Sequence, residues 1–409
     1  MIFSPKTARP RSPQKMMLMI TTLERPPLSD RLRVYGSRVK DARVLEGLRA
    51  GSVAEALQIG ATRYSRLEAA GTSSPVSREE LAALSDVLHF DEDYFLSPTV
   101  TVVERTGLCF RAKKSMTRLQ EDQIGAWARL CGELVHTVLA GSGDSIKMLL
   151  PQLDPRTSPQ LAALTVRDAI GLTVDGPIAQ LTRSLERAGV YIFSAEFAAE
   201  AAARHDAVSL WVGEAKQHPI VMVRASDSWE RTRMSLAHEV GHLVLHRYSK
   251  PEDAEDAAFA FAGEFLMPSQ QIEKEWPSHA TLESLLPMKL KWGVSLSALI
   301  EQGHRLGLLT VERRRSLYKQ LSARRQYPSG RTWREQEPGF DQREVEKPLL
   351  ITRLIERAYA GNISIETLRR MISSWPARYV SPLIEGQFRP PAGHINSSEN
   401  VTSIFARTG

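Results

Sequence analysis

The stretch RTRMSLAHEVGHLVLHR, Arg231 to Arg247, contains the pattern His-Glu-x-x-His between apolar residues. Residues four apart on a helix share a face and lie about 6 Å apart along the axis, so His238 and His242 can bind one metal ion. Zinc accepts imidazole nitrogens and, in catalytic sites, leaves one position for water. Glu239 lies beside the first histidine, where its carboxylate can act on that water as a general base. The spacing therefore predicts a zinc-dependent hydrolytic site on a helix.

The third ligand distinguishes the types of zinc peptidase. Metzincins place glycine and histidine three and six residues after the second histidine, where this chain has Leu245 and Tyr248, so that type is excluded. His246 would lie about 12 Å from His238 on an unbroken helix, too far to share the ion. Glu255 starts the apolar face of the run AEDAAFAFAGEFLMP, so we expect it to be the third ligand. Its alternative role is that of a helix N-terminal acid interacting with the macrodipole.

These two segments together resemble the ImmA/IrrE family of metallopeptidases. The family pattern joins an R-x-x-x-AHELGH-x-x-LH helix to an E-x-x-A-x-x-FA-x-x-LLMP helix, and the resemblance covers roughly residues 162–309. It implies a general base at Glu239 and the metal ligands His238, His242 and Glu255. Phe259 departs from the pattern, because a polar residue is common there in the family.

Three strand-like runs precede the motif, at residues 190–195, 207–213 and 219–225. They are rich in β-branched and aromatic residues and are bounded by Gly, Pro and charged residues, which predicts a small sheet. Helical patterns follow the motif as far as about residue 320. We therefore expect residues 154–320 to form an α+β domain, and the resemblance implies that it is a zincin-like metallopeptidase domain of the gluzincin type.

Far upstream, GLRAGSVAEALQIGATRYSRLE, Gly47 to Glu68, resembles the Xre/Cro helix-turn-helix pattern of a scaffold helix, a tight turn and a recognition helix. The residues that would face the DNA major groove or its phosphates are Ala61, Thr62, Arg63 and Arg66. The family usually has Gln near the start of the scaffold helix, where this chain has Ala50 and Gly51, and the turn reads QIG rather than Gly first. A module that only dimerises or grips a repressor partner stays open.

The surrounding residues 28–98 alternate short helical patterns with glycine breaks, which predicts an all-α domain of four or five helices. Residues 1–78 carry 14 Lys/Arg against 6 Asp/Glu, although the whole chain has a net charge of only +6. A basic N-terminal portion on a near-neutral body suggests that it faces a polyanion such as DNA. The alternative is a basic tail that only aids solubility.

The remaining segments complete a multidomain chain. We expect a disordered basic arm at 1–27, with Met16, Met17 or Met19 as alternative starts, and a helical connector at 99–153. Residues 321–348 are polar with several Pro and Gly, which predicts a surface linker. Residues 349–409 are expected to form a helical C-terminal region that ends in a disordered tail.

Composition indicates a cytoplasmic protein. The two cysteines, Cys109 and Cys131, form no CxxC or Cys/His cluster, which fits a reducing compartment. No apolar run approaches the roughly 18 residues that a membrane helix requires. The oligomeric state is left open, with a homodimer as one option.

The two resemblances together imply a regulator. Members of the ImmA/IrrE family cleave a helix-turn-helix repressor and so switch on stress-response or mobile-element genes, which implies a zinc endopeptidase with a protein substrate. The alternative is a DNA-binding transcriptional regulator or antitoxin whose metal domain senses or stabilises without cleaving. The candidates for stabilising the oxyanion are Tyr248, Arg231 and His246.

Overall fold

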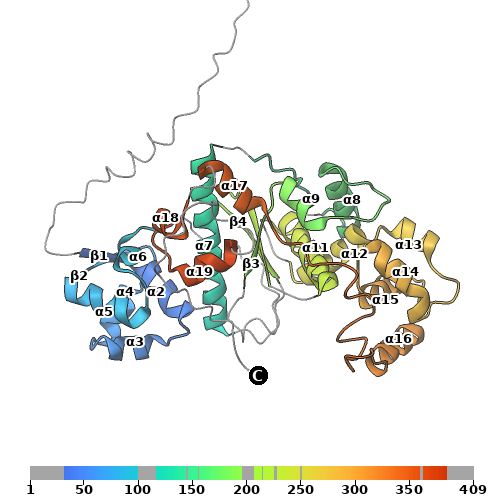
Figure 1. The fold of residues 1–409 in the computed structure, drawn as a ribbon, viewed down its shortest axis with the longest axis horizontal. Coiled ribbons are helices and arrows are strands. Elements are labelled where there is room, and N and C mark those ends of the chain that lie inside the picture. The colour runs from blue at the N-terminus through green and yellow to red at the C-terminus, as the bar shows by residue number, and fades with distance from the viewer. Residues whose placement is uncertain are drawn as a thin grey trace, which may run out of the picture.

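The computed structural model describes residues 32–99, 117–143, 146–154, 156–195, 207–213, 215–224, 228–248, 251–359 and 363–384. Their elements form two sheets and two hydrophobic cores. Figure 1 shows a three-stranded sheet between the long helix α7 (Arg118–Ser142) on one side and the helices α11 (Trp229–Leu245) and α12 (Ala254–Leu266) on the other. The His-Glu-x-x-His motif on α11 is therefore separated from the N-terminal module by the sheet and α7.

The N-terminal module contains helices and a two-stranded antiparallel sheet. Its helices are α2 (Gly36–Leu45), α3 (Ala50–Ala56), α4 (Ala61–Leu67), α5 (Arg78–Leu88) and α6 (Glu92–Leu96). Because β1 (Leu32–Tyr35) pairs with β2 (Ser73–Val76), the expectation of an all-α domain is wrong in this detail. The pairing buries Val34 and Val76. Gly36, at the start of α2, permits the close approach of the Ala69 backbone, since a Cβ there would lie 2.2 Å from the Ala69 carbonyl oxygen.

The first core gathers around α7. Thr117 and Gln120 form a reciprocal capping box at the start of this helix, and Gly143 ends it with a φ of 65°. The helices that share this core are α2 to α6 and the C-terminal helices α17 (Leu350–Tyr359), α18 (Ile365–Met371) and α19 (Ala377–Ile384). The described residues 117–143 of the predicted connector and 350–384 of the predicted C-terminal region, apart from 360–362, thus pack together with the N-terminal module. The predicted arm at 1–27 and the predicted C-terminal tail lie outside the described residues.

A buried polar network fastens this junction. Arg38 on α2 and Glu133 on α7 are almost fully buried and form an ion pair of 2.8 Å. Trp375, which precedes α19, donates a hydrogen bond from Nε1 to the same carboxylate at 2.8 Å. Breaking a buried pair leaves an uncompensated charge, so these contacts hold three distant segments in one arrangement.

The central sheet has the order β3-β5-β4. Its strands are β3 (Tyr191–Ala195), β4 (Ala207–Val212) and β5 (His218–Arg224), which coincide with the three predicted runs. β3 runs parallel to β5, and β4 runs antiparallel to β5 at the edge. Alternate side chains enter different cores: Phe193 packs toward α7, whereas Ile192 packs in the second core with α11. Both faces of this sheet are therefore buried.

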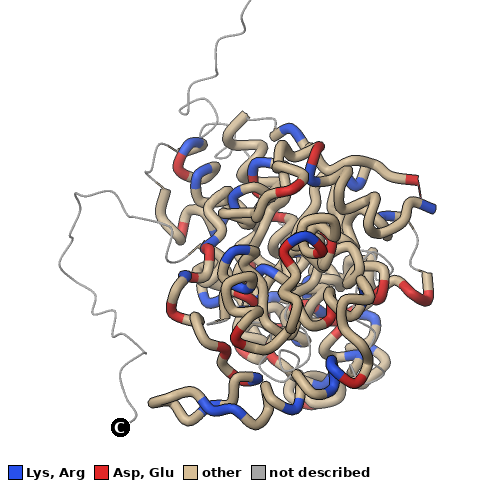
Figure 2. The backbone as a smooth tube through the Cα atoms, turned by 90° about the vertical axis from the view of Figure 1, so that its right-hand side faces the viewer, with Lys and Arg blue, Asp and Glu red and all other residues tan. Residues whose placement is uncertain are grey.

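The second core lies on the other face of the sheet and contains the helices around α11. Besides α11 and α12, they are α8 (Pro159–Ala169), α9 (Leu181–Arg187), α13 (Ser269–Glu275), α14 (Leu282–Trp292), α15 (Leu296–Arg305) and α16 (Val311–Ala323). Figure 2 shows acidic and basic residues interspersed along the backbone on the side of the molecule that carries α13 to α16. Among the described residues, no helix is both long and apolar enough to cross a membrane.

Residues 321–348 were predicted as a linker. Residues 321–323 instead end α16, and residues 324–348 form a strap that is fastened to the second core. Near its end, the Glu346 carboxylate accepts hydrogen bonds from the backbone N–H groups of Leu181 and Thr182, at 3.0 and 2.8 Å. These groups begin α9, where a helix stabilises negative charge. Arg233 on α11 pairs with the same carboxylate at 3.1 Å. The strap is thereby joined directly to the helix that carries the motif.

A second carboxylate fastens the middle of the strap. Glu337 accepts hydrogen bonds from the backbone N–H groups of Leu296 and Ser297 at the start of α15, at 2.7 and 3.3 Å. Its other partner is Lys289, which is fully buried and lies 3.1 Å away. Lys289 also pairs with Glu230 in the first turn of α11. The ion pairs of Lys289 with Glu337 and with Glu230 therefore link the middle of the strap to α11.

Candidate metal centre

The motif helix α11 is defined by local signals and by packing. The Ser228 side chain accepts a hydrogen bond from the backbone N–H of Arg231 at 3.2 Å, which caps the first turn. Leu236, Val240 and Leu243 recur at helical spacing and are buried in the second core. The opposite face presents the histidines to α12, so sequence periodicity already separates the packing face from the polar face.

Gly241 allows α12 to approach α11 closely. A Cβ at this position would lie 3.1 Å from Phe261 Cδ1 and 3.2 Å from the Ala258 Cα, tighter than ordinary contact. Glu255 lies one turn before Ala258 on α12, so its side chain faces the same helix. The small residue inside the motif thus determines how near the carboxylate comes to the histidines.

Three predicted residues meet at this crossing. The Nε2 atoms of His238 and His242 are 3.1 Å apart, and each lies 3.4 Å from a Glu255 carboxylate oxygen. Burial raises the pKa of Glu255, but hydrogen bonds and charge from the two histidines outweigh it and hold that pKa well below its ordinary range. Both histidines are buried and Glu255 is partly exposed, so the cluster opens to one side.

The donor set fits a small, tetrahedral metal ion. Ligand atoms at about 2.0–2.2 Å from zinc in a tetrahedron would lie roughly 3.3–3.6 Å from one another. The two Nε2 atoms are 3.1 Å apart, and His238 Nε2 and His242 Nε2 lie 3.4 Å from Glu255 Oε2 and Oε1 respectively, so each contact is close to that spacing. Two imidazoles and one carboxylate leave a fourth position free, which is typical of catalytic zinc sites rather than structural ones. His246 is not part of this cluster of described residues.

Glu239 is held by a residue that the sequence analysis did not identify. Ser209, fully buried on the edge strand β4, donates a hydrogen bond from Oγ to Glu239 Oε2 at 2.6 Å. The bond fixes the carboxylate at the border of the cluster. The signal available in the sequence was a single serine within the otherwise apolar run AVSLWV, at a position where the strand is buried on both faces.

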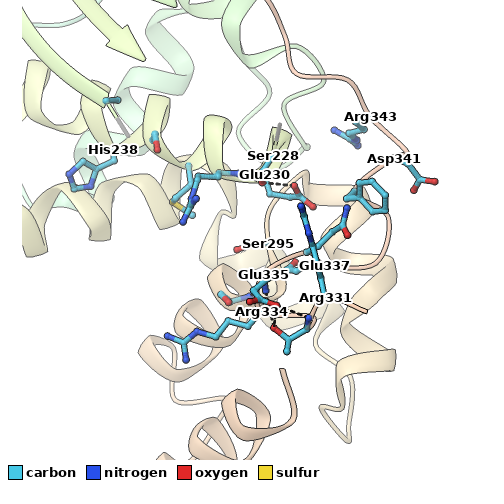
Figure 3. A pocket seen from close by; sticks show the side chains of 18 of the residues that line it. Ser228, Glu230, His238, Ser295, Arg331, Arg334, Glu335, Glu337, Asp341 and Arg343 are labelled. Atoms are coloured by element: carbon cyan, nitrogen blue, oxygen red, sulfur yellow. Dashed lines mark hydrogen bonds between the residues drawn. The ribbon is translucent and has the colours of Figure 1, made fainter. Parts of the chain in front are cut away.

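A cleft of about 1220 Å³ leads away from this cluster. His238, Glu239 and Phe259 line one end, and Figure 3 shows strap residues such as Arg331 and Glu337 at the other. The wall between them is the first half of α11. This groove is large enough for several residues of an extended polypeptide, and the strap forms one of its sides.

The three candidates for stabilising an oxyanion are placed differently. Arg231 is exposed and lines the cleft. Tyr248 is 64% exposed and accepts a hydrogen bond from Gln152 at 3.4 Å. His246 is buried, and its Nδ1 lies 2.9 Å from His242 Nδ1. Among the three, only Arg231 is one of the described residues lining the cleft.

In the N-terminal module, α3 and α4 form the predicted helix pair. Thr62, Arg63 and Arg66 on α4 are exposed, whereas Tyr64 and Leu67 are buried. The predicted contact face is therefore on the surface. The Arg63 guanidinium pairs with a carboxylate of Glu80, but such exposed pairs contribute only about 0–1 kcal/mol, so it can exchange for a phosphate or a base.

Comparisons with protein families agree with this arrangement. Residues 34–94 match the family model of a helix-turn-helix domain, and residues 185–302 match that of the IrrE N-terminal-like domain, a peptidase family. No curated protein matches the chain significantly. The predicted resemblance, an N-terminal helix-turn-helix domain fused to an ImmA/IrrE domain, is confirmed. The peptidase family fits a metallopeptidase and a metal cofactor, and the helix-turn-helix domain fits DNA binding.

Proposed function

We propose that this chain is a zinc-dependent endopeptidase that regulates transcription by cleaving a helix-turn-helix repressor. The observation that carries the proposal is the cluster of two Nε2 atoms and one carboxylate within 3.4 Å of one another, with Glu239 at the head of a cleft. His238, His242 and Glu255 are the proposed metal ligands. The geometry suits zinc and the cleft suits a polypeptide.

The proposed chemistry divides between the ion and the chain. Zinc, when bound, would polarise a peptide carbonyl and acidify water. Glu239 takes the proton from the attacking water and passes it to the leaving amine. Ser209 holds the Glu239 carboxylate in one orientation, and the buried histidines exclude bulk water from one side. Each step of proton transfer therefore uses a residue already held at the head of the cleft.

The N-terminal domain supports a regulatory role. Thr62, Arg63 and Arg66 are the proposed DNA contacts, because they lie exposed on the second helix of the pair. Binding near an operator would bring the peptidase to a repressor on the same DNA. We place this action in the cytoplasm, where DNA and repressor are both present, with stress-response or mobile-element genes as the regulated class.

The first experiment separates cleavage from metal binding. Purified protein and Glu239→Ala are analysed for zinc and incubated with a lysate of the source cells, and new protein N-termini are quantified by mass spectrometry. Both proteins are expected to bind about one zinc, since Glu239 is not a ligand, and only the wild type should release new termini, from helix-turn-helix proteins. Glu252→Ala, in the exposed loop before α12, is the matched control and should behave as wild type.

The outcomes separate the two functions considered. A wild type without bound metal contradicts the peptidase proposal. Metal in both proteins without any Glu239-dependent cleavage favours the alternative, a regulator whose metal domain does not cut.

The second experiment tests DNA binding. A DNA ligand is selected from a random pool, and its affinity is measured for wild type, Arg63→Ala and Arg315→Ala. Loss of one base or phosphate contact should weaken the Arg63→Ala complex about tenfold. Arg315 is exposed on α16, far from α4, so its variant should bind as wild type. Equal affinity of all three proteins contradicts the assignment of α4 as the recognition helix.

A further inference from the structure

The third histidine of the motif helix contacts the second one twice. α11 ends at Leu245, and His246 is its C-cap, with a backbone N–H that donates to the His242 carbonyl at 3.0 Å. The two rings also meet, with His246 Nδ1 at 2.9 Å from His242 Nδ1. His246 is only 8% exposed. Its side chain is therefore held against the far side of the His242 ring, away from the cluster.

The direction of this contact follows from the position of the other nitrogen. His242 Nε2 faces His238 Nε2 and Glu255, so metal binding requires a free lone pair on Nε2. A neutral imidazole then carries its proton on Nδ1. That proton points at His246 Nδ1, which must accept it and carry its own proton on Nε2. The opposite tautomer of the pair would place a proton on His242 Nε2, where it blocks the metal.

The first histidine is held by a different kind of contact. Its Nδ1 is buried and makes no hydrogen bond to any residue that the structure describes. The Phe259 ring packs against it instead, with ring centroids 4.3 Å apart. Within the described residues, hydrogen-bonded support of a histidine in the cluster therefore comes to His242 and not to His238.

We propose that His246 is a positioning residue for the metal centre, which accepts a hydrogen bond from His242 Nδ1 and so selects the tautomer that leaves Nε2 free for the ion. This inference rests on the metal centre proposed above. Partners of this kind orient ligand imidazoles and raise their basicity, and losing one weakens metal affinity about 10- to 100-fold. His246, which is too far from His238 to bind the same ion, would therefore act on the metal centre through His242.

The test compares two variants. His246→Leu removes the acceptor, whereas His246→Asn places an amide oxygen where Nδ1 lies. Zinc affinity is measured by competition with a chromophoric chelator, and the unfolding temperature of each metal-free protein is measured alongside. We expect His246→Leu to bind zinc about 10- to 100-fold more weakly and His246→Asn to stay within about threefold of wild type. His279→Leu, an exposed histidine outside the cluster, is the control.

A second measurement needs no variant. Nitrogen-15 spectra of the histidines in the zinc-loaded wild type report which ring nitrogen carries the proton. The inference expects a proton on His242 Nδ1 and on His246 Nε2. A proton on His246 Nδ1 overturns it even if His246→Leu does not fold.

The outcomes distinguish this inference from the proposed function. A wild type that binds no zinc sinks the metal centre itself. A wild type and His246→Leu that bind zinc equally overturn the role of His246 alone. If His246→Leu and His246→Asn lose affinity equally, together with metal-free stability, then His246 is a packing residue only.

Discussion

Replacing Gly241 by alanine tests whether helix packing determines the metal centre. Alanine in a helix interior is favoured over glycine by about 1 kcal/mol, so an open site would be stabilised. At Gly241, however, the new Cβ would lie 3.1 Å from Phe261 Cδ1 and 3.2 Å from Phe261 Cγ and the Ala258 Cα. Since ordinary contact begins at 3.4 Å, the Phe261 ring must move by about 0.3 Å and the α12 backbone at Ala258 must retreat by about 0.2 Å. Overpacking of this kind costs about 1–3 kcal/mol, so the net result is roughly 0–2 kcal/mol of destabilisation.

The retreat of α12 has a functional consequence. The Glu255 carboxylate lies 3.4 Å from the Nε2 atoms of His238 and His242 in the wild type. Glu255 is one turn before Ala258 on α12, so a retreat of α12 moves the carboxylate away from both histidines. Because ligand distances tolerate only about 0.2 Å, zinc affinity should fall in Gly241→Ala. Chelator competition measures the affinity, and denaturant unfolding of the metal-free protein measures the stability.

A matched control is available in the N-terminal module. Gly51 lies in α3, has a helical backbone and has nothing within 4 Å of the position that its Cβ would occupy. Gly51→Ala should therefore gain up to about 1 kcal/mol of stability and bind zinc as wild type. The reasoning is refuted if Gly241→Ala gains stability to the same degree and keeps wild-type zinc affinity.

Two further predictions concern residues that support α11. Ser209→Ala should lower kcat about tenfold or more and leave zinc content and KM unchanged, because a hydrogen bond to a charged group contributes about 1.5–3 kcal/mol. Ser209→Thr keeps the hydroxyl and should retain activity. An unchanged kcat of Ser209→Ala in steady-state cleavage would contradict this role of Ser209. Lys289→Met should lower the free energy of unfolding by about 3–5 kcal/mol in a denaturant titration, because Glu230 and Glu337 lose their common buried partner. A loss below about 1 kcal/mol would show that Lys289 does not fasten the strap.

Local sequence patterns predicted much of the fold. The runs that form β3, β4 and β5 combine β-branched and aromatic residues over a few positions. In the helix-turn-helix segment, apolar residues recur at helical spacing. Such signals are local, since each depends on residues within a few positions of one another. The β1 and β2 strands were missed because each has only four residues and they pair across about 40 positions. Neither strand is recognisable without its partner.

The strap was predicted as a linker for a similar reason. Its Pro, Gly and charged residues are typical of loops, and they do form irregular backbone. Glu337 and Glu346 nevertheless fasten it, because the N-termini of α15 and α9 supply unpaired N–H groups to their carboxylates. Composition cannot show which helix end a carboxylate will meet.

What the sequence alone determined about the centre is the pair of histidines and the glutamate between them. Helical geometry places residues four apart on one face whatever surrounds the helix, so His238 and His242 had to face together. The tertiary structure decided the remaining contacts. Glu255 comes near only because Gly241 lets α12 approach, and Ser209 reaches Glu239 from a strand thirty residues earlier. Distances within a helix follow from its backbone, whereas distances between segments depend on the packing of the side chains that separate them.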